Sequence, residues 1–110
     1  MAADVGGHVV VLVTAPSREE ARALGRLLVE SKLAACANVA GSVNSCYWWE
    51  GKVETADEVL LILKTRAELV PPLAARVAEA HSYTIPEVVA LPIVGGNPEY
   101  LAWIDASLAR

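Results

Sequence analysis

The sequence YWWEGKVETADEVLLILKTR occupies residues 47–66 and joins an aromatic cluster, a turn and a long extended run. Glu50-Gly51 is typical of a tight turn between antiparallel strands. Lys52–Lys64 predicts one strand of about 43 Å, at about 3.3 Å per residue. Residues 33–50 predict its partner, with a bulge or bend at Gly41-Ser42. The stretch therefore predicts a hairpin that projects beyond the body of a domain of this size.

A strand and a helix precede the hairpin. Val9–Val13 is a short β-branched run and predicts the first strand. Ser17-Arg18-Glu19-Glu20 then forms a capping box, in which the Ser17 hydroxyl accepts from the Glu20 amide and Glu20 reaches back. The helix that starts there is expected to end at about Ser31 or Lys32.

Two helices and a strand follow the hairpin. Thr65-Arg66-Ala67-Glu68 forms a second capping box, and Pro71-Pro72 either kinks the helix or delays its start. Val88–Val94 predicts the fourth strand. Asn97 caps a last helix, with Pro98 at its first position.

The element order β-α-β-β-α-β with a C-terminal helix predicts an α+β protein with the ferredoxin-like split β-α-β fold. Right-handed crossovers arrange the strands as an antiparallel sheet in the order 4-1-3-2, with both main helices on one face. We expect one domain over residues 8–110, because 110 residues suit a single domain, and a flexible N-terminus over residues 1–7.

The other face of this sheet has no predicted cover. A solvated face alternates apolar and polar residues, yet Val9–Val13, Val59–Leu63 and Val88–Val94 are apolar on both sides. Tyr47, Trp48 and Trp49 add aromatic surface to the projecting hairpin, and such residues are typical interface anchors. The hydrophobic share of 55% is therefore explained by a homo-oligomer in which neighbouring subunits cover the sheet and grip the hairpin.

Composition also limits the partners and the location. The net charge is −4 and the basic residues are scattered, which argues against nucleic acid. The longest apolar runs have five residues, far short of a membrane helix.

The N-terminus lacks the pattern of a signal peptide, and Cys36 and Cys46 form no disulfide framework, so we expect a cytoplasmic protein. The absence of a nucleophile elbow or an acid–base set predicts that it is not an enzyme.

Residues after the second helix are the main candidates for a site. His81, Tyr83 and Glu87 lie within seven residues and can converge on one cleft, or His81 can simply end the helix beside a packed tyrosine. Lys64, just before a helix N-terminus, can hold a small anion or extend into solvent. Cys36 lies in an apolar run and is either buried or part of the cleft. These residues match no zinc motif.

Seven segments together resemble the CutA family, the divalent-cation tolerance proteins, and extend over almost the whole chain from His8 onward. They are VTAPS at 13–17, LAACAN at 33–38, WEGKVE at 49–54, ILKTR at 62–66, HSYTIPE at 81–87, ALPI at 90–93 and GNPEYLAW at 96–103.

The resemblance implies a trimer of ferredoxin-like subunits, similar in build to the PII signalling proteins. It also implies a link to copper and other divalent ions. Some bacterial members bind copper through a cysteine in the first strand and two consecutive histidines. Those positions are Val13, Ala80 and His81 here. His81 alone remains, so the resemblance implies weak binding of copper(II) or another divalent cation, with no cofactor required.

We therefore expect a cytoplasmic, non-enzymatic homotrimer for metal-ion tolerance, with a site in the subunit cleft near His81, Tyr83 and Glu87. One alternative is a PII-like sensor of a small anionic metabolite, with Lys64 lining that cleft. Another is a trimeric scaffold whose hairpin binds a protein partner of unknown identity.

Overall fold

The computed structural model describes residues 7–109 as four strands and three helices. In chain order they are β1 His8–Ala15, α2 Arg18–Glu30, β2 Cys36–Trp49, β3 Lys52–Arg66, α3 Val70–Ala80, β4 Val89–Pro92 and α4 Pro98–Ala106. The expected flexible segment falls mostly on residues 1–6, which lie outside the described residues. The carbonyl of Gly7 accepts a hydrogen bond from the Ala67 amide at 2.9 Å.

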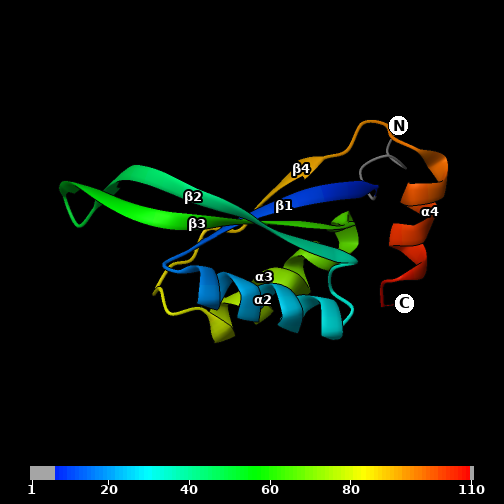
Figure 1. Ribbon diagram of the computed structural model, residues 1–110, viewed down its shortest axis with the longest axis horizontal. Helices are drawn as coiled ribbons and strands as arrows, with labels where there is room; N and C mark the ends of the chain where they lie inside the picture. Colours follow the sequence, from blue (N-terminus) through cyan, green and yellow to red (C-terminus); the bar gives the residue numbers. More distant parts are fainter. Residues whose placement is uncertain (1–6, 110) are drawn as a thin grey trace.

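The strands form one antiparallel sheet in the order β2-β3-β1-β4, which confirms the predicted topology. Figure 1 shows α2 and α3 together on one face of this sheet. Alternate residues of β1 point at these helices, and Val11, Val13 and Ala15 are fully buried there. Leu61 and Leu63 of β3 join them in the same core, so the period of two in the strands directs one side chain in two toward the helices.

The two predicted capping boxes have different outcomes. Ser17 Oγ accepts from the Glu20 amide at 3.1 Å, as expected, although the Glu20 carboxylate turns away to residue 82. The second box is wrong, because the buried Thr65 hydroxyl donates to the carbonyl of Leu33 at 2.7 Å and caps nothing. A 3₁₀ turn follows instead, and the two prolines delay the start of α3 rather than kinking it.

The hairpin of β2 and β3 projects from the body, as predicted (Figure 1). Its pairing continues to Trp49 and Lys52, and the turn places Glu50 at φ 49° and Gly51 at φ 80°. A bulge between Val39 and Gly41 shifts the register, immediately before the Gly41-Ser42 position that the sequence suggested. The longest dimension of the molecule is 43 Å, because the hairpin extends past the end of β1.

The face of the sheet opposite α2 and α3 is apolar and open over much of its area. Leu12 of β1 pairs with Ile62 on one side and with Val89 on the other, which makes an aliphatic row across three strands. Val89 is 47% exposed and Leu91 of the next row 51%. The expected face without helical cover is therefore present, and β4 is shorter than Val88–Val94.

The last helix, α4, stands at the end of the sheet away from the hairpin (Figure 1). Ile104 and Leu108 are buried against Ala35 there. Arg66 donates to Asp105 at 2.8 Å, and this hydrogen bond holds the pKa of Asp105 below its ordinary value. Within the part of the chain that the structure describes, α4 and the other helices are too short or too polar to cross a membrane.

Candidate functional site

A cavity of about 720 Å³ lies where the hairpin leaves the body of the domain. One wall is the aromatic end of β2, namely Tyr47, Trp48 and Trp49. The opposite wall is the segment 82–87, which connects α3 to β4. Glu58 of β3 also lines the cavity, together with small polar residues such as Ser45 and Thr84. The residues before and after the turn of the hairpin therefore share a site with the end of α3.

Glu58 and Tyr83 form the polar centre of this cavity. The Tyr83 hydroxyl donates to Glu58 Oε2 at 2.7 Å, and only 9% of the Glu58 surface is exposed. Burial and, after it, the hydrogen bond to Glu58 raise the pKa of Tyr83 well above its ordinary value. The phenol therefore stays protonated at neutral pH and serves as a hydrogen-bond donor.

His81 sits behind Tyr83, and its side chain is fully buried. Its Nε2 is 2.7 Å from the carbonyl oxygen of Thr14, which can only accept, so this nitrogen carries the proton and donates. Its Nδ1 accepts a hydrogen bond from the Tyr83 amide at 3.0 Å. The centroids of the His81 and Tyr83 rings are 4.6 Å apart. Both ring nitrogens are thus engaged inside the chain, and the imidazole positions Tyr83.

Glu20 ties the same segment to α2. Its Oε2 accepts from both the amide and the hydroxyl of Ser82 at 3.0 Å, and it lies 3.3 Å from His81 Nδ1. This explains why Glu20 does not return to its own helix terminus. The helix thereby fixes the start of the segment that lines the cavity.

The residues predicted to share one cleft fall into two groups within the chain. Tyr83 and Glu87 line the cavity, whereas His81 lies behind Tyr83 and outside the lining. Lys64 and Cys36 do not line the cavity either, because Lys64 is six residues from Glu58 along β3, or about 20 Å. Lys64 Nζ donates to Asn38 Oδ1 at 2.6 Å, and Cys36 Sγ lies 3.5 Å from the same oxygen. Cys36 instead borders a second hollow beside α2 and Trp103.

Sequence reasoning did not find Glu58 or Glu20. The available signal was faint: Asp57 and Glu58 are adjacent acids before an apolar run, and only one of the two is buried. Tyr47, Trp48 and Trp49 were expected at an interface between subunits. In the single chain they line the cavity, with Trp48 as the most exposed at 74%.

Metal-ligating residues are dispersed in this structure. Among residues 7–109, His, Cys, Asp and Glu side chains form no group of three or more that could hold a metal ion. Cys36 and Cys46 are both free thiols, and Cys46 is exposed. A divalent ion on a single chain would therefore meet at most two such ligands in the described part.

Replacing His81 tests its structural role. His81→Ala leaves the Thr14 carbonyl and the Tyr83 amide without their partner, and each unsatisfied buried group costs about 1–3 kcal/mol. We expect the free energy of unfolding in urea to fall by about 2–4 kcal/mol. Glu79→Ala, an exposed change near the end of α3, is the control and should have a small effect. Equal stability of His81→Ala and the wild type would contradict this role.

Comparison with known proteins gives consistent matches over nearly the whole chain. The family model described as CutA1 divalent ion tolerance protein matches residues 9–107. The chain is 48% identical over 99 residues to the rice Protein CutA 1, chloroplastic, which covers 90% of this chain and 56% of the rice protein. It is 50% identical over 95 residues to the Divalent-cation tolerance protein CutA of Thermus thermophilus, covering 86% and 92%. The chain thus spans only about half the length of the rice relative and of its Arabidopsis thaliana counterpart.

Solved structures agree in fold. The divalent cation tolerance protein of Thermus thermophilus superposes with a TM-score of 0.90 at 46% identity, covering 93% of this chain and 99% of that one. The protein from Archaeoglobus fulgidus has a TM-score of 0.87 at 45% identity, covering 91% and 97%.

The names of these relatives contradict the expected cytoplasmic location. The rice and Arabidopsis thaliana proteins are named chloroplastic, and the Archaeoglobus fulgidus protein is described as periplasmic. A lack of disulfides and of a signal pattern was therefore insufficient to assign a compartment.

Proposed function

Because the chain belongs to the CutA1 divalent ion tolerance family, we propose that it contributes to tolerance of divalent metal ions, with copper as the principal ion. The match of residues 9–107 to the family supports the part on divalent ions. The choice of copper rests on the resemblance of the sequence to copper-binding members of the family. We further propose that it acts by binding rather than by catalysis.

We also propose that the working form is a homotrimer. The open aliphatic rows of the sheet and the exposed aromatic hairpin are surfaces that a monomer would leave in water. Trp48 is 74% exposed, so a neighbouring subunit could bury a large part of its side chain. The same exposure supports an alternative in which the hairpin binds another protein. The assembled mass of the purified protein distinguishes the homotrimer from this alternative.

The proposed ion site lies at the mouth of the cavity rather than on His81. Both nitrogens of His81 are engaged, whereas Cys46 is an exposed thiol in the cavity wall and Glu87 an exposed carboxylate in the opposite wall. Thiolate and carboxylate donors from one chain make an incomplete set for copper, so binding should be weak unless subunits combine their ligands.

Copper binding and copper tolerance provide the test. We expect the protein to restore growth in raised copper to cells that lack their own family member, and calorimetry with copper(II) to give heat that Cys46→Ser reduces. His81→Ala should leave that heat unchanged, provided the variant remains folded. Failure of the folded wild-type protein to restore growth would contradict the function. A loss of heat in His81→Ala alone would contradict the site.

The alternative of a sensor for an anionic metabolite has no support in the cavity. Its described lining contains Glu58 and Glu87 and neither lysine nor arginine. That alternative depended on Lys64 as the cation. Lys64 instead donates a hydrogen bond to Asn38 elsewhere on the sheet.

A further inference from the structure

Glu58 is a buried carboxylate that lacks a counter-charge. It is nine-tenths buried, yet within residues 7–109 it takes part in no ion pair, and its one hydrogen bond is the Tyr83 hydroxyl on Oε2. Buried charges in proteins are normally paired, because burial removes the water that stabilises them. Its second oxygen, Oε1, accepts no hydrogen bond from the described residues. Because no enclosed side-chain oxygen among these residues lacks a partner, Oε1 is accessible from the cavity that Glu58 lines.

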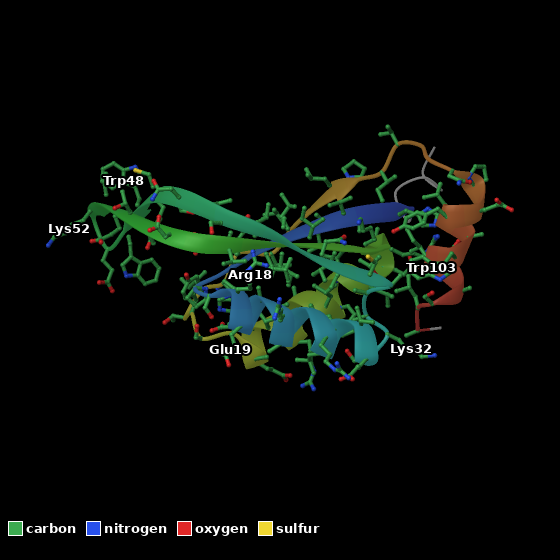
Figure 2. The ribbon with its side chains drawn as sticks, in the orientation of Figure 1. Arg18, Glu19, Lys32, Trp48, Lys52 and Trp103 are labelled. Atoms are coloured by element: carbon green, nitrogen blue, oxygen red, sulfur yellow. The ribbon has the colours of Figure 1, made fainter. Side chains whose placement is uncertain are left out.

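The rest of the cavity adds negative charge and supplies no positive charge. Glu87 is a second carboxylate on the lining, and the lining contains no lysine or arginine among the described residues. Lys52, the one basic residue of the hairpin turn region, extends away from the tip in Figure 2. The cavity therefore presents an acidic interior that is open to a cation from outside.

The aromatic wall suits an organic cation beside Glu58. Tyr47 and Trp49 line the cavity on the Glu58 face of the hairpin, and ammonium groups and alkyl chains both pack favourably on such rings. A hard divalent ion would need several oxygen ligands together, and the described residues contain no such group.

We propose that this cavity binds a small aliphatic amine, with its ammonium group donating to Glu58 Oε1 and its alkyl chain against the aromatic wall. An amine with a second ammonium group can also reach toward Glu87. This inference shares the cavity and Glu87 with the proposed copper site, and Glu58 distinguishes the two because the copper proposal does not use it.

Calorimetry with chemically matched probes tests the proposal. The probes are n-butylammonium and 1,4-diaminobutane, compared with n-butanol and butyrate, which keep the chain but remove or reverse the charge. We expect heat from both amines and none from the alcohol or the acid. Glu58→Gln should weaken amine binding about 10- to 100-fold, the range for a hydrogen bond between charged groups.

Matched variants identify the contribution of each carboxylate. In Glu58→Gln the amide oxygen can still accept from Tyr83, so the fold should persist, and circular dichroism checks this. Glu87→Gln should weaken the diamine more than the monoamine. Glu54→Gln, an exposed acid on the same strand and outside the lining, should change neither.

Three results would overturn the proposal. The first is equal binding of butanol and the amine, and the second is an amine affinity unchanged in Glu58→Gln. The third is the absence of heat from either amine. If the assembled mass also changes in Glu58→Gln, that result assigns the missing cation to a second copy of the chain. Copper-dependent growth should be unaffected by Glu58→Gln, so the failure of one proposal is distinguishable from the failure of the other.

Discussion

Leu12→Glu is expected to convert the proposed trimer into separate, folded chains. Leu12 lies in the middle of the open face, between Ile62 and Val89 in one aliphatic row. In an assembly that covers this face, the substitution removes about 1.5–3 kcal/mol of apolar burial per subunit. It also places a carboxylate where no partner is available, which costs several kcal/mol more. The core is spared, because Leu12 points away from α2 and α3.

Light scattering after size exclusion measures this effect. The wild type should have about three times the chain mass of 11.6 kDa, and Leu12→Glu should have the mass of one chain with an unchanged circular dichroism spectrum. Val94→Glu is the control, since Val94 is 99% exposed and follows β4 rather than lying in the row. A wild-type protein with the mass of one chain would refute the trimer. Retention of the triple mass by Leu12→Glu would show that the face is not the interface.

The topology was predictable because several local signals agreed. Ser17 and Asn97 cap the helices that the sequence assigned to them, and Gly51 takes the positive φ that a tight turn needs. The tight turn between two long extended segments determined the predicted pairing of β2 with β3. Such signals act over a few residues, so a single sequence is sufficient to identify them.

The cavity was only partly predictable, because its chemistry depends on contacts between distant segments. Thr65 fits a capping box locally, yet its hydroxyl is used by Leu33, 32 residues away. Glu20 similarly leaves its helix for Ser82, 62 residues away. His81 was read as a candidate ligand, and nothing in its neighbourhood along the chain indicated that its Nε2 would donate a hydrogen bond to the Thr14 carbonyl. The spacing of residues along the chain does not show that a side chain will bond to a distant segment instead of a local partner.

Leu61→Ala is expected to cause the largest loss of stability within a single chain. Leu61 is fully buried between the sheet and α2, in the core formed with Val13 and Leu28. The helix passes so close that a Cβ on Gly25 would lie 3.3 Å from Leu61 Cδ1. Removing the side chain therefore leaves a cavity that the backbone cannot easily close. We expect the free energy of unfolding to fall by about 2–5 kcal/mol.

Leu60→Ala is the matched control, because the neighbouring residue points to the opposite, open face of the sheet. In the proposed trimer Leu60 contributes to assembly, so the cost of its removal should shrink as the protein is diluted and the subunits separate. The cost of Leu61→Ala should persist at every protein concentration, since its contacts lie within one chain. Urea unfolding at two protein concentrations distinguishes these patterns. Equal, concentration-independent losses in both variants would mean that Leu60 too acts only within its own chain, and that the open face is not buried by a neighbour.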